Sequence, residues 1–206
     1  MSEIRHIVFD IGHVLLHWDP ELPYLDLIPD RAERQHFLQH ICSPQWNLEQ
    51  DRGRDWGDAE TSLIKQYPKK EYLIRAYRER WEESVPHSHD GVVEIYLNLI
   101  KQGYDVSLLT NFNQETFPIA KAKFPFLAKA RAETVSGEVR LIKPDPAIFS
   151  HHQTAHGLSA DHLVFIDDNA ENVRSATDFG WNAIQFAGLQ GADKLKAELA
   201  AFGVKV

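Results

Sequence analysis

Residues 4–16 of this chain read IRHIVFDIGHVLL. The run Ile7-Val8-Phe9 is short, apolar and partly β-branched, which is typical of a strand buried on both faces. The run stops at Asp10, and Gly12 follows at a position where the backbone can turn or approach a ligand closely. Open α/β sheets place their chemistry at the carboxyl ends of buried strands, so Asp10 is a candidate functional residue. In isolation, Asp10 would be interpreted as a turn residue or a helix cap.

The chain has 206 residues, a formal net charge of −8 and a sequence pI near 5.7. This length suits one α/β core with a modest insertion. The negative charge argues against a nucleic-acid partner or an anionic membrane surface. Cys42 is the only cysteine, which excludes an intrachain disulfide and a multi-cysteine metal site. We find no signal-peptide pattern and no apolar run of membrane-spanning length, and we therefore expect a cytoplasmic protein.

Residues 19–85 are rich in charged and aromatic residues and show helical spacing without a strand pattern. Apolar residues recur every three or four positions over 31–41, 58–67 and 71–83, which predicts three amphipathic helices. Asp58 is the expected N-cap of the second helix. Because this segment directly follows the first strand, we expect it to be an insertion that covers the carboxyl ends of the strands.

Strand and helix patterns alternate over the rest of the chain. We expect strands at 106–109, 132–135, 163–166 and 183–186, and helices at 91–101, 116–123, 147–156, 172–179 and 193–202. This alternation indicates a mostly parallel sheet with right-handed crossovers. The predicted fold is therefore α/β, a Rossmann-like sheet flanked by helices. Its core domain comprises residues 1–18 and 86–206, and an inserted α-helical cap comprises residues 19–85.

Three of the predicted strands end in polar residues of catalytic type, namely Asp10, Thr110-Asn111 and Asp167-Asp168. The carboxyl ends of parallel strands meet at one edge of a sheet, so these residues are expected to converge. Lys143 stands at the start of a helix bracketed by Pro144 and Pro146. Carboxylate oxygens are good ligands for Mg²⁺, and Lys, Thr and Asn side chains can bind phosphate oxygens. With two of the acids holding the metal ion, the third is available to attack phosphorus as a nucleophile.

These residues resemble the four motifs of the haloacid dehalogenase (HAD) superfamily. The motifs occur in order as Phe9-Asp10-Ile11-Gly12, Leu109-Thr110-Asn111, Lys143-Pro144-Asp145-Pro146 and Phe165-Ile166-Asp167-Asp168-Asn169. The resemblance covers the whole chain, and four motifs in this order are far more specific than any single one. The insertion after the first motif is similar to the family's helical cap of the first type. The resemblance implies a HAD-like hydrolase that cleaves phosphoric monoesters.

The resemblance also implies a role for each matched residue. Asp10 would be the nucleophile and would form an aspartyl-phosphate. Thr110 would bind the transferring phosphoryl group with Asn111 beside it, and Lys143 would steady its charge. A Mg²⁺ ion would be held by Asp10, the backbone carbonyl of Gly12, Asp167 and Asp168. The implied substrate is a small phosphorylated metabolite.

Gly12 departs from the family pattern. Phosphatases of this family usually carry a second Asp two residues after the nucleophile, as acid for the leaving group and base for water. General acid–base help is worth about 10²–10⁴-fold, and glycine has no proton to give. The resemblance to a D-x-G branch, which includes sugar-phosphate phosphatases, suggests a readily expelled group such as the anomeric oxygen of a sugar 1-phosphate. Alternatively, His13 or a residue of the cap supplies the proton.

The 2-haloacid dehalogenases of the same family are the main alternative. They use an aspartate nucleophile without a metal ion, whereas Asp167 and Asp168 would then put two uncompensated negative charges beside Asp10. This charge balance favours a Mg²⁺-dependent phosphatase. A phosphotransferase such as a mutase, and a catalytically silent sugar-phosphate binder, are two further alternatives.

Several residues near these motifs have two interpretations each. His13 is either a substrate contact or a polar loop residue. Arg52 lies in a segment, residues 49–54, that resembles the substrate-facing loop of family members, and Arg suits an anionic substrate. Surface ion pairing explains Arg52 equally well. Asn172 either supports the metal ligands from one helical turn away or simply begins a helix.

Overall fold

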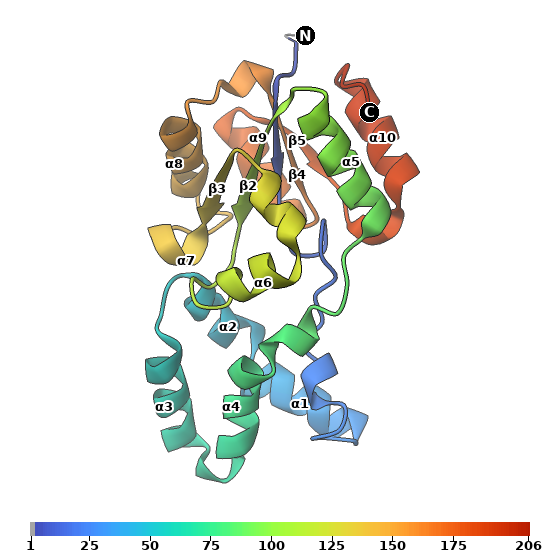
Figure 1. Ribbon diagram of the computed structural model, residues 1–206. Helices are drawn as coiled ribbons and strands as arrows, with labels where there is room; N and C mark the ends of the chain where they lie inside the picture. The colour runs from blue at the N-terminus through green and yellow to red at the C-terminus, as the bar shows by residue number, and fades with distance from the viewer. Residues whose placement is uncertain (1–2) are drawn as a thin grey trace.

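The structure is a computed structural model that describes residues 3–206 (Figure 1). Five parallel strands form one sheet in the order β3-β2-β1-β4-β5. They are β1 (His6–Phe9), β2 (Asp105–Thr110), β3 (Ala132–Val135), β4 (Leu163–Asp167) and β5 (Asn182–Gln185). The predicted parallel α/β fold is therefore confirmed.

The register of the central strands places the motif residues side by side at the carboxyl ends of the strands. Phe9 pairs with Leu108 on one side and with Ile166 on the other. The next residue of each strand, including Asp10 and Asp167, therefore lies at the same edge of the sheet.

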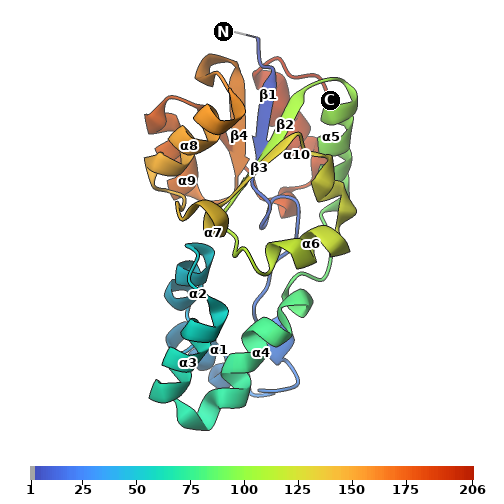
Figure 2. The same ribbon diagram turned by 60° about the vertical axis from the view of Figure 1, so that its left-hand side comes forward.

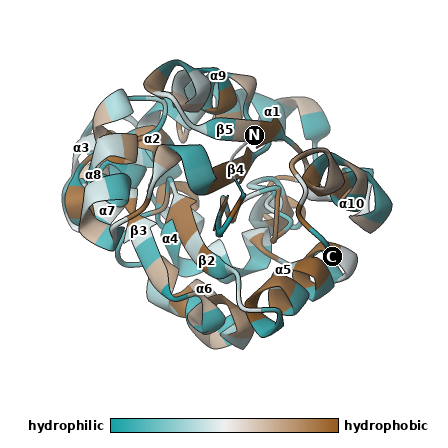
Figure 3. Cartoon of the chain, turned by 90° about the horizontal axis from the view of Figure 1, so that it is seen from above, coloured by the Kyte–Doolittle hydropathy of each residue, from teal (hydrophilic) through white to brown (hydrophobic). Residues whose placement is uncertain are grey.

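Helices cover both faces of the sheet, as the sequence predicts (Figure 2). The pleat directs Ile7 and Phe9 into one apolar cluster and Val8 into another. The first cluster includes residues of α5 (Asp90–Lys101), α6 (Phe117–Lys123) and α10 (Ala192–Ala201), and the second includes residues of α8 (Pro146–His156) and α9 (Ala170–Phe179). Figure 3 shows the apolar residues gathered on the strands at the centre.

Residues 19–85, here called the helical insertion, lie between β1 and β2 and cover the carboxyl ends of the strands (Figure 1). The insertion contains α1 (Arg31–His40), α2 (Pro44–Asp51), α3 (Trp56–Gln66) and α4 (Glu71–Glu79), with 3-10 turns at Leu22–Tyr24, Pro68–Lys70 and Trp81–Ser84. Its own apolar core includes Tyr24, Phe37, Trp56 and Tyr77.

The two segments that join the insertion to the sheet run side by side. The His17 N–H donates to the His87 carbonyl at 3.0 Å, and the Asp19 N–H donates to the Ser84 carbonyl at 2.8 Å. These paired backbone bonds fix where the insertion begins and ends relative to the strand ends.

The N-cap expected for the second helix of the insertion is wrong. The helix begins at Trp56, and its cap is Asp55, whose Oδ1 accepts from the Asp58 N–H at 3.1 Å. Burial of Trp56 extends the helix toward its N-terminus, which moves the cap by three residues.

Two further differences from the predicted helices also lie in the insertion: one helix is shorter than predicted, and one was not predicted. The helix expected over 71–83 ends at Glu79 and is followed by the 3-10 turn at Trp81–Ser84. Helix α2 was not predicted, although Ser43 caps it by accepting from the Trp46 N–H at 3.2 Å.

The remaining elements are α7 (Ser136–Val139) and 3-10 turns at Pro125–Lys129, Ala160–His162 and Gly188–Gln190. None of the helices within residues 3–206 has the length and apolar content needed to cross a bilayer.

Candidate active site

Asp10 follows β1 directly and begins a tight loop. Its N–H continues the sheet by donating to the Ile166 carbonyl at 2.9 Å, and its side chain is 11% exposed. The Leu15 and Leu16 N–H groups both donate to the Ile11 carbonyl at 2.9 Å. His13 adopts the left-handed conformation with φ of 55°. This compact turn holds the Asp10 carboxylate at the edge of the sheet.

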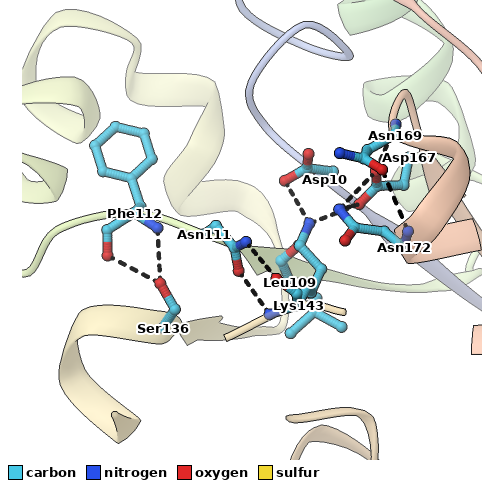
Figure 4. A network of polar contacts seen from close by, with 9 residues as sticks. All are labelled: Asp10, Leu109, Asn111, Phe112, Ser136, Lys143, Asp167, Asn169 and Asn172. Atoms are coloured by element: carbon cyan, nitrogen blue, oxygen red, sulfur yellow. Dashed lines mark hydrogen bonds and ion pairs between the residues drawn. The ribbon is translucent and has the colours of Figure 1, made fainter. Parts of the chain in front are cut away.

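Lys143 lies between the motifs of three strands (Figure 4). Its Nζ is 2.9 Å from Asp10 Oδ1, 2.7 Å from Asp167 Oδ2 and 2.9 Å from the Leu109 carbonyl oxygen. An ammonium has three hydrogens, and these three acceptors engage all of them. Burial acts to lower the pKa of Lys143, but the charges of Asp10 and Asp167 outweigh it and raise that pKa. Lys143 is therefore a permanent buried cation.

Asn111 holds the backbone of Lys143 in place. Its Nδ2 donates to the Lys143 carbonyl at 2.9 Å, and its Oδ1 accepts from the Lys143 N–H at 2.9 Å (Figure 4). These reciprocal bonds make Asn111 a positioning residue for Lys143.

Three carboxylates gather at the strand ends. Asp10, Asp167 and Asp168 each offer an oxygen, and these oxygens lie within 4.8 Å of one another. Burial and the neighbouring Asp167 raise the pKa of Asp10 to about 7, although Lys143 opposes this. Burial and Asp167 likewise raise the pKa of Asp168. One lysine does not balance three carboxylates, and the all-oxygen donor set fits Mg²⁺.

Asn172 and Asn169 orient the Asp167 carboxylate. Asn172 Nδ2 lies 3.0 Å from Asp167 Oδ1 and 3.1 Å from Oδ2, and the Asn169 N–H donates to Oδ1 at 2.9 Å. Asn169 is the N-cap of α9, so Asn172 is not the residue that begins the helix. Asn172 therefore has the supporting position that its spacing from the acidic pair suggests.

A cavity of about 360 Å³ opens between the strand ends and the helical insertion. Its polar end is formed by the core residues Asp10, His13, Asn111 and Asp168. Its remaining walls are largely apolar and come from both parts of the chain, including Leu16, Trp18, Leu48, Trp56, Trp81, Val85 and Phe112. Asn47 and Asp51 of α2 are polar exceptions on the insertion side.

Of the other residues predicted for the site, Gly12 lines the cavity, whereas Thr110 and Arg52 do not. Thr110 ends β2 with 1% exposure, and it is not among the described residues that line the cavity. Arg52 is also outside the lining, with a half-exposed side chain 3.7 Å from Glu49. The Gly12 backbone lines the cavity, and its carbonyl accepts from the Val14 N–H at 2.7 Å.

Asp51 is an acidic lining residue that the sequence analysis missed. Burial raises its pKa to about 8, against the opposing effect of the Asn113 N–H. The sequence offers one signal, an acidic residue within the arginine-containing segment 49–54. That segment ends a helix, and only the packing of α2 decides that Asp51 rather than Arg52 faces the cavity.

A comparison with protein families identifies the family of this chain. The profile of the haloacid dehalogenase-like hydrolase family matches residues 36–186. Two curated relatives are each 26% identical: a drimenol cyclase of Aspergillus calidoustus over 89% of this chain, and an (S)-2-haloacid dehalogenase of Burkholderia cepacia over 56%. The matches span 34% and 48% of those two proteins, so this chain corresponds to about a third to a half of their lengths.

Solved structures share the fold over almost the whole chain. A protein described as a predicted HAD-like family hydrolase from Porphyromonas gingivalis is 20% identical, with a TM-score of 0.78 over 97% of this chain and 98% of that one. A HAD family enzyme from Bacteroides thetaiotaomicron, solved with magnesium and inorganic phosphate, is 21% identical, with a TM-score of 0.74 over 93% and 98% of the two chains.

Proposed function

This chain belongs to the haloacid dehalogenase-like hydrolase family, and we propose that it is a Mg²⁺-dependent phosphatase of a small phosphorylated metabolite. The observation that carries the proposal is the cluster of Asp10, Asp167 and Asp168, of which the first two bind the Lys143 ammonium. Such a site offers a nucleophile, oxygen ligands for a divalent cation and a fixed positive charge. The related enzyme solved with magnesium and phosphate supports the same chemistry.

Asp10 is the proposed nucleophile. Its carboxylate oxygen bonds to phosphorus while the ester P–O bond breaks, and the resulting aspartyl-phosphate is then cleaved by water to release inorganic phosphate. Lys143 keeps the Asp10 carboxylate oriented, since one of its three hydrogen bonds is to Asp10 Oδ1 at 2.9 Å. Thr110, which is buried at the end of β2 and outside the described cavity lining, is retained as the proposed contact for the transferring phosphoryl group on the family resemblance.

Mg²⁺ is proposed to be held by Asp10, Asp167, Asp168 and the Gly12 carbonyl. When bound, it supplies positive charge to phosphate oxygens and to the crowded carboxylates. Asn172 and Asn169 keep Asp167 turned toward the other two acids.

The helical insertion is proposed to act as the cap that admits substrate and excludes bulk water. Its wall of the cavity is mainly apolar, with Leu48 and Trp56 among the lining residues. We propose that the organic group of the substrate presents apolar surface to this wall. The narrower hypothesis of a sugar 1-phosphate fits less well, because most of the hydroxyl groups would meet carbon. Arg52, whose half-exposed side chain lies outside the cavity lining, is proposed to contact only those substrate groups that protrude from the cavity.

A 2-haloacid dehalogenase is disfavoured by the same residues. Three carboxylates and one lysine leave a net negative site, and a haloacid substrate would add a further carboxylate. A phosphate ester also brings negative charge, but its oxygens can share the divalent cation with the acids.

Hydrolysis of 4-nitrophenyl phosphate, with Mg²⁺ and with EDTA, tests the proposal. We expect activity that requires Mg²⁺ and falls by at least about 10³-fold in Asp10→Asn, because the amide is not a nucleophile. The exposed Asp58→Asn variant is the matched control and should keep full activity. Activity that persists in EDTA, or chloride release from 2-chloropropionate, would overturn the phosphatase proposal.

A further inference from the structure

On the core side of the cavity, His13 lies beside Asp168 and is, among the described residues, the one titratable lining residue outside the three clustered acids. Gly12 occupies the position two residues after Asp10 and carries no side chain. In an in-line displacement, the leaving oxygen departs on the side of phosphorus opposite the nucleophile. From Asp10 at the strand ends, that direction is toward the helical insertion across the cavity. A proton donor is therefore needed on the insertion wall.

We propose that Asp51, at the end of α2, is the general acid for the leaving oxygen and then the general base for water. This inference rests on the proposed phosphatase function. Asp51 and Asp10 line the same cavity, Asp51 from the helical insertion and Asp10 from the end of β1. Asp51 is the carboxyl group that the insertion contributes to the lining of this cavity.

The backbone around Asp51 is fastened to the core. The Asp51 carbonyl accepts from Ser136 Oγ at 2.5 Å, and the preceding Gln50 carbonyl accepts from Asn113 Nδ2 at 2.9 Å. Ser136 follows β3 and Asn113 follows β2. The end of α2 is thus docked on the start of α7 and on the loop after β2, which fixes the position of Asp51 relative to the strand ends.

The Asp51 side chain is also oriented. Its Oδ2 accepts from Asn47 Nδ2 at 2.9 Å, and Asn47 lies one helical turn earlier and lines the same cavity. Asn113 and Tyr77 of α4 are further neighbours of the carboxyl group. Burial also raises the pKa of Tyr77, so this neighbour brings no charge.

The protonation state suits the role. Burial raises the pKa of Asp51 to about 8, so the carboxyl group keeps its proton near neutral pH. A donor whose pKa lies near the working pH can both give and regain a proton efficiently.

Each half-reaction balances with Asp51 as the proton carrier. As Asp10 bonds to phosphorus, the electron pair of the breaking P–O bond goes to the leaving oxygen, which takes the proton of Asp51. In the second half, the Asp51 carboxylate takes a proton from water while the water oxygen bonds to phosphorus. The phosphorus–Asp10 bond breaks, which restores the Asp10 carboxylate and the neutral Asp51 and releases phosphate.

The test compares two esters that share an aromatic ring and differ in the leaving group. 4-Nitrophenyl phosphate expels a stabilised phenolate, whereas 2-phenylethyl phosphate must expel an alkoxide. We expect Asp51→Asn to lower kcat on the alkyl ester by about 10²–10⁴-fold and on the nitrophenyl ester by less than about tenfold. Asp51→Glu should recover part of the loss, and Asp58→Asn should behave as wild type.

The pH profile gives a second readout. The wild-type rate on the alkyl ester should fall as pH rises through about 8, because Asp51 loses its proton, and Asp51→Asn should lack that limb. Without substrate, the infrared difference between wild type and Asp51→Asn should show a carboxylic acid band that disappears as pH rises through about 8, whereas the bands of Asp10 and Asp168 are common to both proteins and cancel.

Equal losses on both esters, or no loss on either, would overturn the role of Asp51 while leaving the phosphatase proposal intact. The phosphatase proposal itself fails separately, if the wild type shows no Mg²⁺-dependent, Asp10-dependent hydrolysis. A folded Asp51→Asn variant, checked by circular dichroism, whose infrared spectrum matches that of the wild type through this pH range would also overturn the assignment.

Discussion

Lys143 Nζ lies 2.7 Å from Asp167 Oδ2, and both side chains are almost completely buried. The same ammonium is 2.9 Å from Asp10, so one cation is shared by two of the three clustered acids. Removing one partner of a buried ion pair leaves an uncompensated charge, which is far more costly than losing a surface pair.

We therefore predict that Lys143→Met destabilises the protein by about 3–5 kcal/mol in EDTA and abolishes most activity. Mg²⁺ should recover part of the stability, because the cation replaces some of the lost charge. Denaturant unfolding with and without Mg²⁺ measures both effects. Lys121→Met removes a half-exposed pair with Glu133 and should cost less than about 1 kcal/mol. Equal stability of Lys143→Met and wild type in EDTA would contradict the prediction.

Gly12 has room for the acid that it lacks. A Cβ built there meets no heavy atom within 4 Å, and Gly12 is not among the glycines with positive φ. We predict that Gly12→Asp raises the rate on 2-phenylethyl phosphate in the Asp51→Asn background by at least about tenfold. Gly12→Asn is the matched control, since it has a similar shape and no acidic proton. Equal rates for the two variants would show that the missing acid does not limit this background.

The core half of the site was predictable because its signals are local. Asp10 and Asp167 each follow a run of apolar residues, and the parallel sheet brings such positions to one edge without further information. Pro144 and Pro146 indicate the start of a helix, which was sufficient to predict the position of Lys143. The structure adds what spacing alone does not contain, such as the pairing of the Asn111 amide with the Lys143 backbone.

The insertion half was less predictable because its side chains are placed by tertiary packing. Ser43 followed by Pro44 is a typical start of a helix, and α2 was missed because this signal was not used in the prediction. Even with α2 in place, Asp51 and Arg52 are adjacent, and one faces the cavity while the other faces solvent. That choice depends on hydrogen bonds to Ser136 and Asn113, more than sixty residues away in the chain.

The apolar wall predicts a preference among substrates. Aryl or branched alkyl phosphates should have higher kcat/KM than glucose 1-phosphate, because their organic groups bury carbon against the wall. Leu48→Asn should lower kcat/KM for 2-phenylethyl phosphate by about tenfold and change that for glucose 1-phosphate little. Leu97→Asn, at an exposed leucine of α5 outside the cavity lining, is the control. Preference of the wild type for glucose 1-phosphate would restore the sugar hypothesis.

His152 makes the stability of the core depend on pH. Its ring is fully buried, with Nε2 at 2.9 Å from Ser107 Oγ and Nδ1 at 2.8 Å from Thr134 Oγ1. Burial, and to a smaller extent the nearby His156, lowers the pKa of His152 from 6.5 to about 3. The folded state therefore binds fewer protons than the unfolded state in this range, and folding favours the neutral ring.

The contribution of His152 is fully present above pH 6.5 and is lost as pH falls toward about 3. Each pH unit in this window corresponds to about 1.4 kcal/mol, so lowering the pH from about 6.5 to about 4.5 should cost about 2–3 kcal/mol. His152→Gln keeps polar groups for Ser107 and Thr134 without titrating, and its unfolding free energy should fall less over this range. The exposed neighbour serves as control, since His151→Gln should follow the wild type. If all three proteins lose the same stability between these pH values, another buried group controls the acid sensitivity.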